Sequence, residues 1–530
     1  MITAERNTEV RIAVAVVLLG LTASLALGLC SEGMHHVDDL AHFLMAKWSW
    51  TYPAWLVDDW GRPGFTTLYA IPAAIGWPAA RAWSAAISAL TAWMAFRLAQ
   101  RSGVKSAWLV PALTYAQPLF FELTLTTLTE TALAFYLTAA LLLAARSQWT
   151  CSAAVISVAF VTRYESIAFL PVWAFFAWQQ RVPWWRLWPL PWAVVAFSTA
   201  ALIAGMPVAA VRWLSPQPTT WYGSGGWLTM LARTVQACGP ALAAMGLAGS
   251  IALMRAAWPG RMAATIVVVH LGVQTAIRAL GAFDSGGYAR FLVPIAPCVA
   301  IAATACWHHL GDAESGRRRR AVAWLAVAIA ILWLSVEVQV RRPETPRDLP
   351  QVAQAATAVR AACGALLLIC VVAAAPLHRR RSPRSAFISG TSLLRAALIG
   401  LTSATMAVLA RPLALGPAER AIAQEMDWLR SAGLGDRPIV SAHAYVEYLT
   451  GLAQPPNRPG LNGRLHHAPI GAILAWDSQF APAPHQDLPL ADAEASLSLR
   501  FLRGAEAERG FRLRLYEKVG DWPLPSGRAR

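Results

Sequence analysis

Two adjacent carboxylates, Asp38 and Asp39, stand in the stretch CSEGMHHVDDLAHFLMAKW, between His36 and His42. A carboxylate beside an acceptor hydroxyl can act as a general base and take the proton as the hydroxyl attacks. The same pair could instead only stabilise a helix N-terminus, where the helix dipole favours negative charge. Both interpretations stay open at this point, because the pair alone is a weak motif.

Cations and carboxylates elsewhere in the chain are candidates for binding a substrate that carries a phosphate. An arginine side chain suits a phosphate because its planar guanidinium presents two N–H donors to two oxygen atoms. The candidate cations are Lys47, Arg62, Arg163 in VTRYES and Arg290 in YARFL, and the candidate acidic residues are Glu130 in LTLTTLTETALAF and Asp284 in GAFDSGGYAR.

These residues also have structural interpretations. Arg163 is followed by Glu165, so the two could form an ion pair within the membrane. Arg290 could extend its guanidinium to the interface from the end of a span, and Glu130 at a helix start would interact favourably with the dipole. Asp284 could bind an acceptor or pair with Arg290.

Two further patterns rank below the first acidic pair. Asp58 and Asp59 repeat the pair, but WLVDDWGRP is typical of a turn before Pro63. His–His pairs occur at 35–36, 308–309 and 466–467, and the first of them, with Asp38 and His42, could supply a metal site of nitrogen and oxygen ligands. The seven cysteines include no C-x-x-C pair, which predicts neither a zinc site nor a disulfide framework.

The composition decides which elements can position these residues. Of 530 residues, 56% are apolar and only 14% are charged, and 25 are Trp, which predicts an all-α polytopic membrane protein. The net charge of +16 comes from short basic patches between apolar runs. We interpret the charge as a signal for membrane orientation and expect no nucleic-acid partner.

Runs of about 20 apolar residues predict about 13 transmembrane helices. The expected spans lie near 11–29, 82–99, 106–121, 127–145, 152–179 as a tight pair, 188–205, 228–254, 262–280, 290–307, 321–340, 357–376 and 391–410. The positive-inside rule places the N-terminus in the cytoplasm and, for an odd number of spans, the C-terminus outside. The basic stretch RRPETPRDLP at 341–350 is an exception to this scheme. The acidic residues of the membrane part then lie on the outer side, where carboxylates at membrane depth indicate function.

Two segments outside the spans complete the predicted organisation. Residues 30–81 form a Trp-rich outer loop, for which we expect short helices along the membrane surface. From 411 the composition predicts a small extracytoplasmic α/β domain, with a helix in PAERAIAQEMDWLRSAG, strands in RPIVSAH, GAILAWD and GFRLRLYEKVG, and a loop in QPPNRPGLNGR. The predicted domains are therefore a membrane domain over 1–410 and a C-terminal domain over 411–530.

These features together resemble the GT-C superfamily of membrane glycosyltransferases, which use polyprenyl-phosphate sugars. The resemblance rests on the acidic pair of the first outer loop, an acidic residue in the second, and YARFLVPIAP at 288–297, which is similar to the family's Arg-Phe/Tyr-x-x-Pro-x-x-Pro stretch. In the dolichol-linked mannosyltransferase and protein O-mannosyltransferase branches the first loop reads roughly His-Pro-Asp-Glu, whereas this chain has HVDD at 36–39. The resemblance covers about residues 11–310.

The resemblance implies an inverting transfer of a sugar, such as mannose or another hexose, from a polyprenyl phosphate to a lipid, glycan or protein hydroxyl. It assigns the base to Asp38, with Asp39 as the alternative. The cations would neutralise the leaving phosphate, and the family pattern favours Arg290 over Arg163. Glu130 matches the second-loop acidic position, where it would orient the acceptor. No metal cofactor is expected, because family members with a single-phosphate donor generally need none.

Two other classes of function remain as alternatives. A flippase or transporter for a lipid-linked sugar would also carry ionisable residues in its spans, although such proteins often show internal repeats, and none is visible here. A scaffold whose C-terminal domain binds envelope partners is the third. The Arg-rich, Lys-poor and Ala-rich composition is typical of a GC-rich bacterial genome. We therefore expect a bacterial inner membrane, with the active site facing the periplasm or the cell exterior.

Overall fold

The computed structural model describes residues 2–208, 211, 222–283, 285–312, 314–341, 349–374 and 390–523. These divide into two compact units. The first comprises residues 1–28, 81–203 and 207–411, and the second comprises residues 29–80, 204–206 and 412–530.

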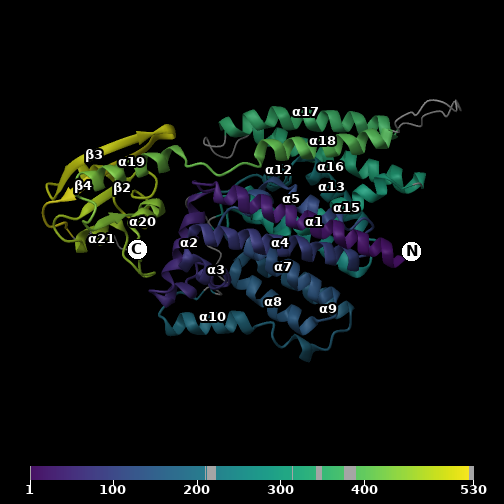
Figure 1. Cartoon of the computed structure of the whole chain (residues 1–530), viewed down its shortest axis with the longest axis horizontal. Helices are drawn as coiled ribbons and strands as arrows, with labels where there is room; N and C mark the ends of the chain where they lie inside the picture. Colours follow the sequence, from purple (N-terminus) through teal and green to yellow (C-terminus); the bar gives the residue numbers. More distant parts are fainter. Residues whose placement is uncertain are drawn as a thin grey trace. The chain divides into compact units, whose positions relative to one another are not determined.

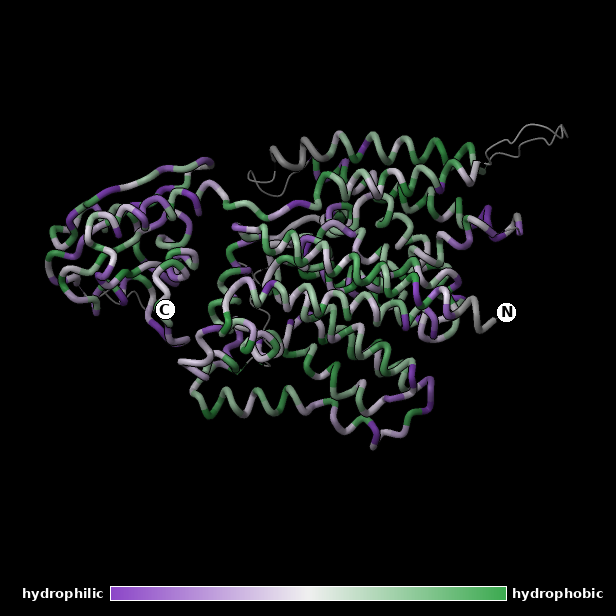
Figure 2. Tube along the Cα trace, in the orientation of Figure 1, coloured by the Kyte–Doolittle hydropathy of each residue, from purple (hydrophilic) through white to green (hydrophobic). Residues whose placement is uncertain are grey.

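The first unit is a bundle of apolar helices that run side by side (Figures 1 and 2). Its helices are α1 (Ile2–Leu29), α4 (Trp77–Arg101), α5 (Leu109–Tyr115), α6 (Pro118–Leu123), α7 (Thr129–Ala145), α8 (Trp149–Thr162), η2 (Tyr164–Ala168), α9 (Phe169–Gln179), η3 (Trp184–Leu187), α10 (Trp192–Ile203), α12 (Thr229–Cys238), α13 (Pro240–Leu253), α14 (Trp258–Leu280), η4 (Ala289–Ile295), α15 (Ala296–Leu310), α16 (Ser315–Arg341), α17 (Leu349–Ala374) and α18 (Gly390–Leu409). Every span expected from the sequence coincides with one of these helices or with a pair of them, which confirms the helical membrane fold.

Among the described residues, six helices are long and apolar enough to cross a membrane, or up to seven if a bent pair counts as one span. The six are Asn7–Leu29, Trp258–Leu280, Ala289–Leu310, Gly316–Arg341, Ala356–Ala374 and Gly390–Leu409. Others are apolar but shorter, such as α7, α8 and α10. At 1.5 Å per residue, a helix of that length is shorter than a hydrocarbon core of about 30 Å. The count of about 13 crossings therefore stays a prediction.

Glycine allows two close approaches inside the bundle. α13 packs against α15, where a Cβ atom on Gly246 would lie 2.7 Å from Val299 Cγ1 and one on Gly249 would overlap the Ala302 carbonyl. Small residues at such positions let helix backbones approach closely, which is a main source of packing energy in a membrane. Gly239 separates α12 from α13 with φ of +75°, and the two helices meet at 114°.

The second unit contains α2 (Val37–Trp48), η1 (Pro53–Leu56) and α3 (Pro63–Ile75), together with a four-stranded sheet and its helices. The strands are β1 (Ile439–Ser441), β2 (Ile473–Asp477), β3 (Leu499–Ala507) and β4 (Phe511–Lys518), in the order β1-β2-β4-β3. β1 and β2 are parallel and the other pairs are antiparallel. The helices are α19 (Pro417–Ser431), α20 (Ala444–Thr450), α21 (Leu461–His467) and α22 (Leu490–Ala495), with the short η5 (Glu508–Gly510) between β3 and β4.

Residues 29–80 pack directly against C-terminal residues. The Leu413 N–H donates to Ser31 Oγ at 2.8 Å, and the Trp55 indole donates to the Gln454 carbonyl at 2.7 Å. The ring of Tyr448 makes edge contacts with Phe43 and Trp77. Residues 29–80 and 412–530 therefore form one compact unit, while the domain division at residue 410 stays a prediction.

Most sequence expectations for the C-terminal segment are confirmed, namely the helix α19 and the strands β1, β2 and β4. The expected loop QPPNRPGLNGR is wrong at its end, because α21 begins at Leu461. The Trp476 indole donates to the Leu488 carbonyl at 2.9 Å, and Leu461 and Leu465 pack beside it in the core of this sheet. Burial of those two leucines explains why a Gly-containing stretch becomes helical, since tertiary packing overrides propensity.

Candidate functional site

The acidic pair lies in the first turn of α2, in the second unit. His36 is the N-cap residue, and its Nδ1 accepts a hydrogen bond from the Asp38 N–H at 3.3 Å. The same nitrogen lies 3.2 Å from Asp38 Oδ2. A ring nitrogen that accepts the backbone proton is unprotonated, so it cannot donate to the carboxylate at the same time.

The two carboxylates differ in access. The Asp38 side chain is 26% exposed, whereas Asp39 is 0% exposed. A general base must come within hydrogen-bonding distance of its substrate. The Asp38 side chain is accessible from outside the protein, and Asp39 is enclosed by protein. Both positions benefit from the helix dipole, so the structural interpretation applies to both.

His42 does not join these residues in a metal-binding group. Its ring is buried, stacks on Trp60 at a centroid distance of 5.0 Å and lies 5.4 Å from the ring of Phe65. Across the described ranges, no group of three or more His, Cys, Asp or Glu side chains is placed to hold a metal ion. Independence from metal stays a prediction.

The two cations expected from the first loop belong to the end of α2 and to the residue before α3. Lys47 is in the last turn of α2, nine residues after Asp38, which is roughly 14 Å along the helix axis. Arg62 precedes α3 with φ of +63°, and its guanidinium donates to the Asp59 carbonyl at 3.2 Å. Neither side chain is fully buried.

The second acidic pair forms the turn that the sequence predicts before Pro63. Asp58 Oδ1 accepts a hydrogen bond from the Gly61 N–H at 2.6 Å. Burial raises the pKa of the Asp58 carboxyl above its usual value, and that hydrogen bond opposes the rise. Asp58 and Asp59 are both buried, which agrees with a structural role in shaping the loop.

Three predicted residues come together in the first unit, from segments far apart in the sequence. Glu130 is in the first turn of α7, Arg163 lies between α8 and η2, and Arg290 is in η4. Glu130 Oε1 lies 2.7 Å from a terminal nitrogen of Arg163 and 3.4 Å from Nε of Arg290. One carboxylate therefore holds two guanidinium groups, and all three side chains are buried.

Arg163 has a second carboxylate partner. Its Nε lies 2.6 Å from Glu165 Oε1, and it also donates to Thr129 Oγ1 at 3.0 Å. Gln274 donates to Glu165 at 3.4 Å. Two arginines and two glutamates thus balance in charge, as buried ions require. The ion-pair interpretation of Arg163 agrees with this geometry.

Aromatic rings cover the two guanidinium groups. Arg163 lies over the Phe291 ring at 4.6 Å, and Arg290 over Tyr288 at 5.0 Å and over Phe291 at 5.6 Å. The His270 Nε2 atom is 2.7 Å from the Phe291 carbonyl oxygen and fixes this segment. Cation–π contacts of this kind strengthen when water is excluded.

Sequence reasoning missed the polar face of α14. His270, Gln274 and Arg278 are spaced four residues apart, so they lie on one side of that helix. Polar residues inside an apolar span are a functional signal by default, and this spacing was the available clue. Arg278 donates to the backbone carbonyls of Gly223 at 3.0 Å and Ser285 at 3.2 Å. Asp284, the remaining predicted residue, lies outside the described residues.

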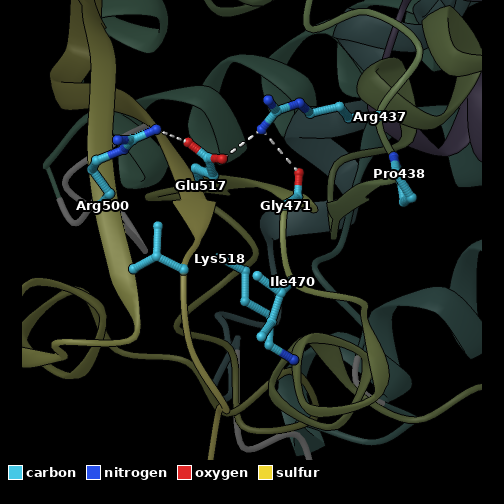
Figure 3. Close-up of a pocket in the computed structure, with 8 residues that line it drawn as sticks. Arg437, Pro438, Ile470, Gly471, Arg500, Glu517 and Lys518 are labelled. Atoms are coloured by element: carbon cyan, nitrogen blue, oxygen red, sulfur yellow. Dashed lines mark hydrogen bonds and ion pairs between the residues drawn. The ribbon is translucent and has the colours of Figure 1, made fainter.

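A cavity of about 560 Å³ lies at one end of the C-terminal sheet (Figure 3). Glu517 forms ion pairs there with Arg437, at 2.6 Å, and with Arg500. These two partners hold the pKa of the Glu517 carboxyl below its usual value. Lys518 points away from this ion pair and donates to the carbonyls of 465, 466 and 468. The charges of this cavity are therefore satisfied within the protein.

The helical membrane bundle with its small α/β domain has a GT-C-type fold, which confirms the fold that the sequence resemblance implied. ArnT from Cupriavidus metallidurans shares this fold. Its structure bound to undecaprenyl phosphate has 16% identity and a TM-score of 0.55, with 99% of this chain and 100% of that chain covered. Its apo structure gives the same identity and TM-score, with 95% and 98% covered. No family model and no curated protein sequence matches the chain.

Proposed function

We propose that this protein is an inverting membrane glycosyltransferase. It moves a sugar from a polyprenyl-phosphate donor to a hydroxyl of a lipid, glycan or protein acceptor on the outer face of the membrane. The observation that carries the proposal is the GT-C-type fold over nearly the whole chain, shared with an ArnT structure that holds undecaprenyl phosphate. The sequence resemblance at HVDD and YARFLVPIAP supports it independently.

Asp38 is the proposed general base. As the acceptor oxygen attacks the anomeric carbon, its proton passes to the Asp38 carboxylate. The bond between the anomeric carbon and the phosphate oxygen breaks in the same displacement, and the lipid phosphate leaves with the bonding electrons. One displacement inverts the anomeric centre. The partial exposure of Asp38, against the complete burial of Asp39, supports this choice.

Arg290 is the proposed principal ligand of the donor phosphate. A guanidinium stabilises the charge that develops on the leaving oxygen, and such a phosphate needs no acid if cations neutralise it. Glu130 and Arg163 would fix the position of Arg290 through their shared ion pairs. We also propose Lys47, Arg62 and Asp284 as substrate contacts. We propose that the transferred sugar is a hexose such as mannose, that the reaction needs no metal, and that the protein lies in a bacterial inner membrane.

The test uses membranes with matched amounts of wild-type, Asp38→Asn or Asp39→Asn protein. Radiolabelled polyprenyl-phosphate mannose or glucose is added, and label is followed into lipid and protein fractions. Loss of a general base lowers a rate by about 10²–10⁴-fold, which we expect for Asp38→Asn. Asp427→Asn is the matched control, because Asp427 is an exposed carboxylate of α19 paired with Arg430.

The outcomes separate the alternatives. Full activity of Asp38→Asn would remove the proposed base, and loss only in Asp39→Asn, with unchanged thermal stability, would transfer the role to Asp39. Label that crosses the membrane without transfer would contradict the enzyme and favour a transporter. If neither mannose nor glucose is transferred, other polyprenyl-phosphate sugars are to be tested as donors.

A further inference from the structure

A second cavity, of about 500 Å³, lies at one end of the helix bundle. It is lined by the segment between α4 and α5, the end of α13, the end of α15 and the beginning of α16. α13, α15 and α16 pack against one another in the first unit (Figure 1). The cavity is therefore built within the bundle from one connecting segment and the ends of three helices.

The rim of this cavity is basic. Lys105, Arg255, Arg317 and Arg320 line it, with His308 and His309, and no Asp or Glu is among the described lining residues. Arg317 is neutralised by its neighbours, because its nitrogens lie 3.6 Å from Asp312 Oδ2 and 2.5 Å from Glu314 Oε2.

The other three cations are not paired with a carboxylate among the described residues. Within the described chain, no carboxylate lies at ion-pair distance from Lys105, Arg255 or Arg320. The Arg320 side chain donates to the Gly316 carbonyl at 3.3 Å. His309 Nδ1 lies 4.0 Å from Asp312 Oδ2. The rim therefore carries an uncompensated positive charge that suits an anion.

Part of the cavity lining is apolar. Ile251 of α13 is 40% exposed and Trp324 of α16 is 44% exposed, and both line the cavity. Arg317, Arg320 and Trp324 recur at helical spacing, so the same face of α16 changes from basic to apolar along its length. A ligand that fits both parts has an anionic end and a hydrocarbon part.

This cavity is separate from the Glu130–Arg290 cluster. Arg290 precedes α15 and the two histidines are in its last turn, so the helix of 15 residues separates them by roughly 22 Å. The cavity and the cluster are at opposite ends of one helix.

We propose that this cavity binds an anionic phospholipid from the leaflet at the basic end of the bundle. Its phosphodiester lies among Lys105, Arg255 and Arg320, and its acyl chains lie along Ile251 and Trp324. Clusters of cations between transmembrane helices recognise lipid headgroups in this way. The proposal does not depend on the sugar-transfer reaction.

Native mass spectrometry of the full-length protein in detergent tests the proposal. Dioleoylphosphatidylglycerol is titrated against dioleoylphosphatidylcholine, which has the same acyl chains and no net charge. The variant Lys105→Gln/Arg255→Gln/Arg320→Gln is compared with Arg146→Gln/Arg186→Gln/Arg319→Gln, which removes the same charge from exposed arginines that do not line the cavity. We expect the first variant to bind phosphatidylglycerol at least tenfold more weakly than wild type, and the second to bind like wild type.

Equal losses in both variants, or no loss in the first, would overturn the proposal. Glycerol 3-phosphate and inorganic phosphate are added as soluble competitors. Displacement of the lipid by either at equal concentration would assign the cavity to a soluble anion instead. If the triple variant does not fold, the single variant Arg320→Gln replaces it, with an expected weakening of about threefold and Arg319→Gln as its control.

Discussion

At the scale of single residues, Glu130 links the two arginines of the candidate site. Its Oε1 is shared by Arg163 and Arg290, and all three are buried. Removing one partner of a buried ion pair typically costs about 3–5 kcal/mol, because a charge is left without compensation. We expect Glu130→Gln to lower the free energy of unfolding by about 3 kcal/mol. The measurement is the decrease of the thermal midpoint in detergent relative to wild type. Glu314→Gln, which breaks an exposed pair with Arg317, should change the free energy of unfolding by less than about 1 kcal/mol.

Two buried groups of the C-terminal sheet titrate in opposite directions. Burial raises the pKa of the Asp477 carboxyl to about 6, although the N–H groups of Gln479 and Phe480 donate to it. Burial lowers the pKa of the His443 imidazole to about 4. As pH rises from about 4 to about 6, the stability that Asp477 contributes as a neutral acid is lost. Over nearly the same range the stability that His443 contributes as a neutral base is gained, so the two effects nearly cancel.

Substitution of one residue should make the pH dependence of stability from the other one measurable. Without the Asp477 carboxyl, only His443 titrates in this range. In Asp477→Asn the free energy of unfolding should therefore be about 3 kcal/mol lower at pH 4 than at pH 6.5, whereas in wild type it should differ little, because each pKa unit corresponds to about 1.4 kcal/mol. His443→Asn, which keeps a side-chain acceptor for the start of α20, should show the opposite trend. Urea-dependent proteolysis of the full-length protein measures the local stability. The same pH dependence in wild type and both variants would contradict the assignment.

At the scale of elements, the break between α12 and α13 depends on glycine. Gly239 has φ of +75° and ψ of +155°, a conformation that is strained by about 1–3 kcal/mol for other residues. Gly239→Ala should lower the thermal midpoint of the purified protein by a corresponding amount. Gly272→Ala in α14 should be neutral or stabilising, because a Cβ there meets nothing within 4 Å and alanine is the better helix former. Equal effects of the two substitutions would show that the bend at 239 stores no strain.

The sequence predicted helices better than it predicted where they break or pack. Apolar runs located the helices of the bundle apart from the short η3, because a membrane requires such runs. The edge strand β3 was missed, since its exposed positions include Arg500 and Glu506, and charged side chains on an edge strand hide the usual alternation. Helix α21 was missed because Gly460 and Gly463 argue against a helix until Leu461 and Leu465 are known to be buried.

At the scale of the whole molecule, the sequence predicted candidate residues but not their contacts. Glu130, Arg163 and Arg290 were each singled out by residue type and motif, yet nothing in their spacing indicated that one carboxylate joins the two arginines. Such contacts depend on how α7, α8 and η4 pack, which a single sequence does not encode as a local pattern. The polar face of α14 could have been predicted from the four-residue spacing of its polar residues. This face contributes a hydrogen bond to the cluster.

Orientation in the membrane follows from the distribution of charge along the whole chain. The basic patches should face the cytoplasm and the C-terminal residues the outside. Cys30 and Cys151 are first replaced by Ser, because these two thiols are exposed. A single cysteine is then introduced as Arg319→Cys or as Leu497→Cys. Leu497 is 98% exposed and Arg319 is exposed at the start of α16. In spheroplasts, a membrane-impermeant maleimide should label Leu497→Cys, and should label Arg319→Cys only after permeabilisation. The protein with no introduced cysteine measures background from the buried thiols, and labelling of both positions from one side would contradict the predicted topology.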